Sequence, residues 1–352
     1  MQTIRASSPT KAIIAGEHSV VYGGIAISAP LGIRKECVCT WSKKEGAGSI
    51  TVDDSMGNGT YLATHEFVDK DGWFLAKAKL IEYLLKSEGK KIEGLDIKLD
   101  LSKEKILKGT GHSAATAATI ALCLYSMNGI LPSKEKLFSA VQKFEEVAHG
   151  GRASGIDAQT VISDSSQEFR KVFQKDGNAR FQFEGIDLQF PIGASLLVIN
   201  SRKKEEKTQT TAEMVQKFAD HFKIIKKPAE MSEKEREKIT APFDELVEKI
   251  KMELHQKGDA RKLGQLMTQN HELLKKAGVS SDGLEEAREI CEKNGALGFK
   301  ITGAGGIGGA AIAIVNESEV EKILSALKQK GFAAMKAKLS TKGACLMEKD
   351  GN

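Results

Sequence analysis

Residues 108–127 read Lys-Gly-Thr-Gly-His-Ser-Ala-Ala-Thr-Ala-Ala-Thr-Ile-Ala-Leu-Cys-Leu-Tyr-Ser-Met. Before this stretch, residues 94–101 alternate between apolar and polar, which predicts a half-buried strand. The apolar run Ala114–Met127 is too short to cross a bilayer and predicts a buried helix. A glycine loop that opens a helix suits a phosphate group, because backbone N–H groups and the helix dipole both attract anions. A tight turn without any ligand fits the same residues equally well, and the Gly-Lys-Ser/Thr of a Walker A loop is absent.

A second glycine loop, Gly303-Ala304-Gly305-Gly306-Ile307-Gly308-Gly309, separates two predicted strands, 297–302 and 310–315. Its spacing matches G-x-G-x-x-G, the dinucleotide-binding pattern. That pattern requires a following helix and an acidic residue about 20 positions further on. Because a strand follows instead, we exclude a dehydrogenase. Close approach of a ligand to this loop and a plain hairpin both remain open.

Four titratable residues stand out by their position in the chain. Lys11 lies in an apolar stretch, where it either meets a buried anion or extends to solvent. Asp157 follows Ser154-Gly155-Ile156 in a tight turn, where it acts as a base or caps the next helix. Glu145 and His149 share one helix face, as a metal site or as a surface pair. For each residue taken alone, the purely structural alternative is favoured.

Composition limits the class of protein. The chain has 352 residues, 41% of them hydrophobic and 28% charged, which is typical of a globular protein rather than a disordered one. The net charge of +5 is mild, so we expect no nucleic-acid partner, and an anionic small substrate is compatible. The five cysteines have irregular spacing, which favours reduced thiols and a cytoplasmic location. Neither a spanning segment nor a signal-peptide pattern is visible, so we expect no membrane association.

The pattern of elements predicts two domains of an α+β protein, 1–190 and 191–352. In the first, we expect strands at 11–14 and 25–29, a helix at 73–86, and a helix that begins after Ser133. The second domain should contain a small sheet covered by helices. Its strands are predicted at 194–200, 297–302, 310–315 and 333–339, and its helices at 208–221, 236–255, 259–277, 282–294 and 317–330.

Four segments in a fixed order together resemble the GHMP kinase superfamily, and within it the mevalonate kinases. The segments are Ser8-Pro9-Thr10-Lys11 through Gly16-Glu17-His18-Ser19 to Gly23, Gly109–Ala115, His149-Gly150 through Ser154-Gly155-Ile156-Asp157, and Lys300-Ile301-Thr302-Gly303-Ala304-Gly305-Gly306. The chain departs from the family pattern at Lys105, Thr110, His112 and Ala158. The resemblance implies a two-domain fold, with an N-terminal domain like domain 2 of ribosomal protein S5 and a ferredoxin-like C-terminal domain.

The same resemblance implies phosphorylation of mevalonate to 5-phosphomevalonate by ATP and Mg²⁺, in isoprenoid biosynthesis. Asp157 would accept the proton of the substrate hydroxyl, and Lys11 would stabilise the developing negative charge. Gly109, Thr110, Gly111, His112, Ser113 and Ala114 would bind the phosphates. Ser113 and Glu145 would hold Mg²⁺, with Glu146 as the alternative carboxylate.

The resemblance also implies where the substrate lies and how the chain assembles. Glu17, His18, Ser19 and either Thr208 or Thr210 would lie near the substrate. Gly303, Ala304, Gly305 and Gly306 would line the active site. A homodimer is expected. Another GHMP kinase, such as a phosphomevalonate kinase, is an alternative, and so is a ligand-binding regulator that has lost turnover.

Overall fold

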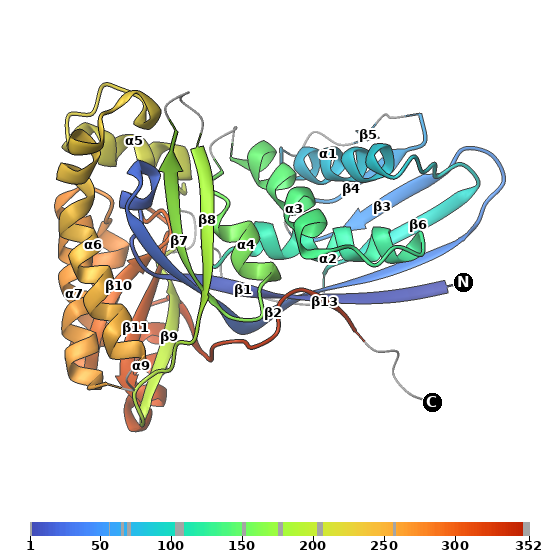
Figure 1. Cartoon of the computed structure of the whole chain (residues 1–352). Helices are drawn as coiled ribbons and strands as arrows, with labels where there is room; N and C mark the ends of the chain where they lie inside the picture. The colour runs from blue at the N-terminus through green and yellow to red at the C-terminus, as the bar shows by residue number, and fades with distance from the viewer. Residues whose placement is uncertain are drawn as a thin grey trace.

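The fold is that of a computed structural model, which describes residues 2–55, 57–64, 67–68, 72–102, 109–149, 153–174, 179–202, 207–255 and 258–347. Four residues that the family resemblance uses lie outside this part of the chain: Lys105, Gly150, Gly151 and Arg152. Two sheets with their own helices stand side by side along the molecule (Figure 1).

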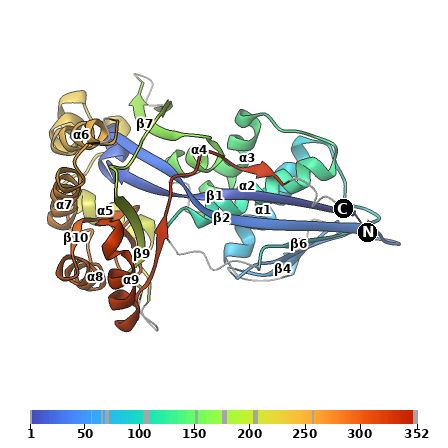
Figure 2. The ribbon, with the colours of Figure 1, turned by 90° about the horizontal axis from the view of Figure 1, so that it is seen from below.

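The first sheet contains nine strands in the described residues, in the order β13-β1-β2-β6-β3-β4-β5, with β7 joined to β2 and β8 to β7. The pairs are antiparallel except β3 with β6. Its strands are β1 (Gln2–Ala15), β2 (Ile25–Lys43), β3 (Ser49–Asp53), β4 (Gly59–Leu62), β5 (Phe67–Val68), β6 (Leu95–Asp100), β7 (Ser166–Phe173), β8 (Ala179–Ile186) and β13 (Cys345–Leu346). The long β1–β2 ladder runs through the centre of the molecule (Figure 2).

The central strand β1 is much longer than the predicted segment 11–14. The prediction missed the first half of β1 because Ser7, Ser8 and Thr10 interrupt its apolar pattern. These hydroxyl residues are nevertheless buried, since β1 is covered by other elements along this stretch.

Helices cover one face of this sheet (Figure 1). They are α1 (Gly72–Ser87), α2 (His112–Met127), α3 (Lys134–Ala148) and α4 (Ile156–Ile162). The apolar α2 packs directly on β1 and β2, and α1 and α3 pack against it. Ser133 caps α3 as predicted, because its hydroxyl accepts a hydrogen bond from the Lys136 N–H at 3.2 Å.

The second sheet has the order β10-β11-β9-β12 and is antiparallel throughout. The second glycine loop connects β10 to β11, so the structure confirms that a strand and not a helix follows it. The strands are β9 (Ala194–Asn200), β10 (Ala296–Thr302), β11 (Ala310–Asn316) and β12 (Ala333–Ala337). The helices are α5 (Thr211–His221), α6 (Glu233–His255), α7 (Ala260–Lys276), α8 (Asp282–Lys293) and α9 (Val320–Gln329), with short 3₁₀ turns η1 (Ser19–Tyr22), η2 (Pro228–Glu230) and η3 (Glu317–Glu319).

The predicted helix 208–221 begins later than expected. Thr210 is the N-cap of α5 and forms a capping box with Glu213, so the helix starts at Thr211 and residues 208–210 lie outside it. No helix within the described residues combines the length and apolar character needed to cross a bilayer.

Several contacts join the two sheets. The Thr302 hydroxyl at the end of β10 accepts a hydrogen bond from the Ile13 N–H at 2.8 Å and donates to the Ile13 carbonyl at 3.0 Å. The chain also returns from the second sheet to the first, where β13 pairs with Ala6 and Ser7 of β1. The ends of both sheets thereby face one another across a cavity.

Candidate active site

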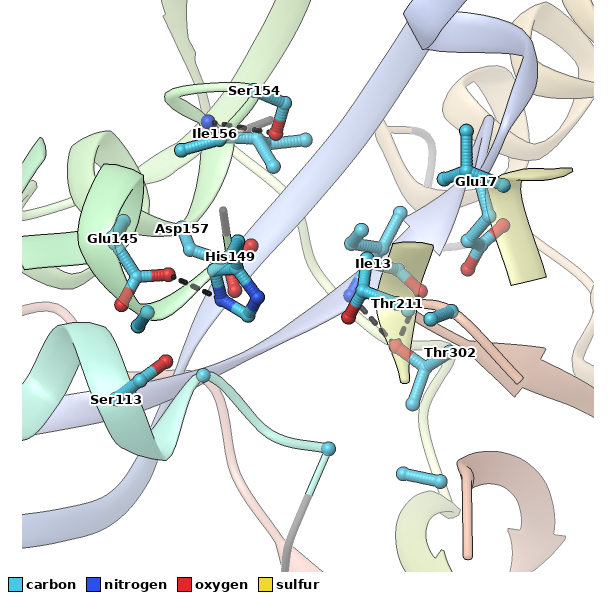
Figure 3. Close-up of a pocket in the computed structure, with 18 of the residues that line it drawn as sticks. Ile13, Glu17, Ser113, Glu145, His149, Ser154, Ile156, Asp157, Thr211 and Thr302 are labelled. Atoms are coloured by element: carbon cyan, nitrogen blue, oxygen red, sulfur yellow. Dashed lines mark hydrogen bonds and ion pairs between the residues drawn. The ribbon is translucent and has the colours of Figure 1, made fainter. Parts of the chain in front are cut away.

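A cavity of about 430 Å³ lies where the two sheets meet. It is bounded by the end of β1, the N-termini of α2 and α4, the C-terminal end of α3, residues 208–211 and the loop between β10 and β11. Figure 3 shows Glu145, His149, Asp157 and Ser113 at one side of this cavity, and Ile13, Thr302 and Thr211 at the other. The cavity therefore collects side chains from segments that are far apart in the sequence.

Lys11 and Asp157 form an ion pair inside the cavity, with 2.9 Å between Lys11 Nζ and Asp157 Oδ1. The Lys11 side chain is only 3% exposed and that of Asp157 is 25% exposed. The alternative of a solvent-directed lysine is therefore wrong. So is the alternative of Asp157 as a helix cap, because the N-cap of α4 is Gly155 and Asp157 lies in the first turn. A buried ammonium beside a carboxylate that the cavity can reach provides a cation and a proton acceptor at one point.

The first glycine loop leads into the cavity at the N-terminus of α2. Gly111 is the N-cap with φ of 68°, and no side chain caps the helix there. A helix N-terminus of this kind attracts anions through the dipole of the helix. Gly109, Gly111, His112 and Ser113 line the cavity. Thr110 and Ala114 do not line it: Thr110 is buried and its carbonyl accepts from the Lys11 N–H at 2.7 Å, while Ala114 packs in the core.

At the end of α3 the buried Glu145 pairs with the half-buried His149, with 3.1 Å between His149 Nε2 and Glu145 Oε2. Glu145 is 2% exposed, so a surface pair is excluded. Burial alone would lower the pKa of His149, but Glu145 and the nearby Asp157 outweigh it and raise this pKa. Glu146 instead faces outward, 43% exposed and 3.5 Å from Lys143.

The remaining oxygen of Glu145, Oε1, is buried and has no hydrogen-bond partner among the described residues. The neighbouring Ser113 hydroxyl lies on the same side of the cavity (Figure 3). No group of three or more His, Cys, Asp or Glu side chains in the described residues could hold a metal by itself. Magnesium needs no such group, because it is usually bound by one or two carboxylates together with substrate phosphates and water. Glu145 and Ser113 therefore fit this ion.

Of the three adjacent residues predicted to lie near the substrate, Glu17 and His18 line the cavity and Ser19 does not. Ser19 is buried and its hydroxyl donates to the Gly16 carbonyl at 3.2 Å. Glu17 forms a buried ion pair with Lys300. Burial raises the pKa of Glu17 and lowers the pKa of Lys300, although the attraction between them opposes both shifts.

His18 lies at the wall of the cavity beside the second glycine loop. Its ring stacks on Phe218 with 5.2 Å between centroids, and its Nε2–H donates to the Ala304 carbonyl at 3.0 Å. Burial lowers the pKa of His18 to about 4, so the ring is neutral at pH 7.

The second glycine loop faces the segment before α5. Gly303, Ala304 and Gly305 line the cavity, whereas Gly306 does not and donates its N–H to the Val279 carbonyl at 2.9 Å. Thr208 and Thr210 both line the cavity. The Thr210 hydroxyl is engaged in the α5 capping box, which leaves Thr208 as the better candidate for contact with a ligand.

Several cavity residues were not found from the sequence: Trp73, Gln142, Gln209 and Thr302. Gln209 is held to the glycine loop by two hydrogen bonds of 3.0 Å with the backbone of Ile307. Thr302 lies inside the last of the four quoted segments, so that segment was the available signal for it. We see no comparable signal in the sequence for Trp73, Gln142 or Gln209.

Two family models match the chain and identify the class of protein. The model described as "GHMP kinases N terminal domain" matches residues 75–164, and "GHMP kinases C terminal" matches residues 230–334. Together they cover more than half of the chain, and the chain belongs to the GHMP kinase family. Its members are small-molecule kinases that use ATP. The predicted two-domain GHMP kinase fold is confirmed.

The similar proteins include mevalonate kinases along their whole length. The mevalonate kinase of Aeropyrum pernix is 28% identical over 351 residues, which is 98% of each chain. The crystal structure of L. major mevalonate kinase in complex with R-mevalonate has a TM-score of 0.72 and 22% identity, covering 96% of this chain and 97% of that one. Lactococcus lactis galactokinase complexed with galactose has a TM-score of 0.70 and 17% identity, covering 98% and 95%. Structural similarity at this level shows the fold and does not select a substrate.

Proposed function

We propose that this GHMP kinase transfers the γ-phosphoryl group of ATP to mevalonate, with Asp157 and Lys11 as its catalytic residues. The observation that carries the proposal is the ion pair of 2.9 Å between Lys11 Nζ and Asp157 Oδ1, placed in a cavity beside the uncapped N-terminus of α2. The choice of mevalonate as the substrate is supported by the similarity, along nearly the whole chain, to proteins named mevalonate kinase.

The chemistry follows from the positions of the two charges. The Asp157 carboxylate accepts the proton of the substrate hydroxyl as the hydroxyl oxygen attacks the γ-phosphorus. The Lys11 ammonium lies beside it and stabilises negative charge on the attacking oxygen. The O–P bond to the β-phosphate breaks and ADP leaves. Positioning and electrostatics supply most of the acceleration in phosphoryl transfer, so the burial of Lys11 strengthens its effect.

The phosphates of ATP lie at Gly109, Gly111, His112 and Ser113 in this proposal, where the N–H groups at the start of α2 reach the cavity. Ser113 and Glu145 would hold Mg²⁺, for which the unpartnered Oε1 of Glu145 would provide a hard oxygen ligand. When bound there, Mg²⁺ would supply positive charge against the β- and γ-phosphates. His18, Thr208 and residues 303–305 line the part of the cavity that we assign to mevalonate.

The first test is ADP release with ATP and Mg²⁺, in separate reactions with mevalonate, phosphomevalonate, galactose and homoserine. We expect rapid release with mevalonate alone, and loss of that release when EDTA removes Mg²⁺. ADP release with another of the four compounds would support kinase activity but contradict mevalonate as the substrate. If none of the four compounds causes ADP release although ATP binds measurably, the alternative of a ligand-binding regulator without turnover would be favoured.

The second test replaces the proposed base. Asp157→Asn keeps the shape of the side chain and removes its capacity to accept a proton. We expect kcat to fall by about 10²–10⁴-fold while ATP affinity, measured by calorimetry, stays within a few-fold of wild type. Asp187→Asn, at an exposed position, is the control and should have normal turnover. Near-normal turnover of Asp157→Asn would exclude Asp157 as the base.

A further inference from the structure

His149 lies between two carboxylates that the proposed function uses and has itself no part in that mechanism. Its Nε2 is 3.1 Å from Glu145 Oε2, and it lies close enough to Asp157 in the same cavity for the two charges to interact. His149 is also the C-cap of α3, and its backbone N–H donates to the Glu145 carbonyl at 2.9 Å. Both its side chain and its backbone are therefore bound to the same residue.

The direction of the side-chain hydrogen bond is determined by chemistry. An ionised carboxylate only accepts, so His149 must present Nε2–H to Glu145 Oε2. This bond occupies one of the two oxygens of Glu145. The other, Oε1, is buried without a partner among the described residues, on the side of the cavity that contains Ser113.

We propose that His149 is a positioning residue for a divalent cation: it holds Glu145 by Oε2 so that Oε1 is directed at the ion. The inference rests on the proposed function in placing that ion at Glu145. A carboxylate ligand with one oxygen tethered loses less rotational freedom when it binds the metal. Removal of such a partner typically costs 10–100-fold in metal affinity.

A direct ligand role for His149 fits less well. Its Nε2 is already engaged with Glu145, and Mg²⁺ takes oxygen ligands in preference to imidazole nitrogen. A role limited to the end of α3 is the competing explanation. That explanation predicts that replacing His149 lowers thermal stability without a selective effect on cation binding.

The experiment measures how much Mg²⁺ strengthens ATP binding by the full chain, with no acceptor substrate present. Calorimetry gives the ATP dissociation constant in EDTA and in excess Mg²⁺, and the ratio of the two is the Mg²⁺-dependent gain. We expect His149→Leu and Glu145→Gln to reduce this gain by about 10-fold or more, with ATP affinity in EDTA unchanged. His149→Gln, whose amide N–H can replace Nε2–H, should retain most of the gain.

The matched control is His255→Leu, since His255 also ends a helix but is exposed and outside the cavity. It should have the wild-type gain. If His149→Leu does not fold, His149→Asn replaces it, because the shorter amide is polar but does not reach Glu145. We expect His149→Asn to lose the gain as well.

Three results would overturn the proposal: a normal gain in His149→Leu or His149→Asn, equal losses with and without Mg²⁺, or no gain in the wild type. None of these readings requires turnover of mevalonate. If the variants change the Mg²⁺-dependent gain as expected but the protein does not phosphorylate mevalonate, only the proposed substrate would be contradicted. Turnover of mevalonate with a normal gain in His149→Leu would contradict this inference alone.

Discussion

At the scale of single residues, the buried lysines of this protein form ion pairs. Four lysines of the described residues are buried, and each meets a carboxylate. Lys35 and Lys77 share Asp54 at 3.0 and 2.7 Å, away from the cavity. These charges must be paired because an isolated buried ammonium would be unstable or lose its proton.

His18 is a buried residue without such a partner, and its titration should be visible in the stability of the protein. Burial lowers its pKa from 6.5 to about 4. Below pH 6.5, His18 binds a proton in the unfolded chain but stays neutral in the folded protein. The contribution of neutral His18 to the free energy of unfolding is therefore fully present above pH 6.5 and is lost as the pH falls toward 4. The full loss corresponds to about 3 kcal/mol.

We expect urea unfolding at pH 7 and pH 4.5 to show a larger loss in the wild type than in His18→Asn. Asparagine is the suitable replacement, because position 18 has φ of 61° and asparagine tolerates positive φ better than most residues. Equal losses in both proteins would mean that burial does not hold this pKa down.

At the scale of elements, the start of α2 and the end of β1 are built around each other. Gly111 caps α2 with φ of 68°, and a Cβ at this position would lie 2.6 Å from Cγ of Lys11. The glycine therefore provides both the backbone conformation of the first glycine loop and the space for the lysine beside it.

Gly111→Ala should consequently affect catalysis more than stability. Strain at positive φ should cost about 1 kcal/mol of unfolding free energy, and displacement of Lys11 should lower kcat by about 10²-fold. Gly89→Ala is the matched control: it has φ of 58° and nothing within 4 Å of the added Cβ. Thermal unfolding and mevalonate-dependent ADP release of both variants separate the two effects. Normal turnover of Gly111→Ala would show that Lys11 has room to adjust.

At the scale of the whole molecule, the C-terminal segment ties the two halves together. Arg34 on β2 donates to the carbonyls of Ser7, Lys342 and Gly343 and to the hydroxyls of Ser7 and Ser340. The same segment is bound to the end of α4, where the Ala344 N–H donates to the Val161 carbonyl at 2.9 Å. Figure 1 shows β13 lying along β1.

Arg34→Met should release this segment. We expect a loss of about 2–3 kcal/mol in urea unfolding, because several acceptors lose a charged donor at once. Limited proteolysis should then cut the chain between residues 338 and 347 sooner than in wild type. Arg261→Met, at an exposed position of α7, should change neither. An unchanged unfolding curve for Arg34→Met would mean that β13 pairing alone holds the segment.

Local patterns predicted a large part of the elements. Alternation identified β6, apolar runs identified α2 and β9, and Ser133 marked the start of α3. Such signals work because helices and strands repeat their environment every few residues. The first half of β1 and the short β13 were not predicted, since neither has an apolar period of its own.

The sequence by itself determined the order of the motifs, and with it the family and the residue types that reach the cavity. Only the tertiary structure decided which of them act together. Lys11 meets Asp157, and Glu17 meets Lys300, across separations in the chain that no local pattern spans. Likewise, Glu145 lines the cavity and Glu146 does not, which depends on the face of α3 that is buried. The physical reason is that motifs record local backbone and side-chain chemistry, whereas burial and ion pairing depend on how distant segments pack.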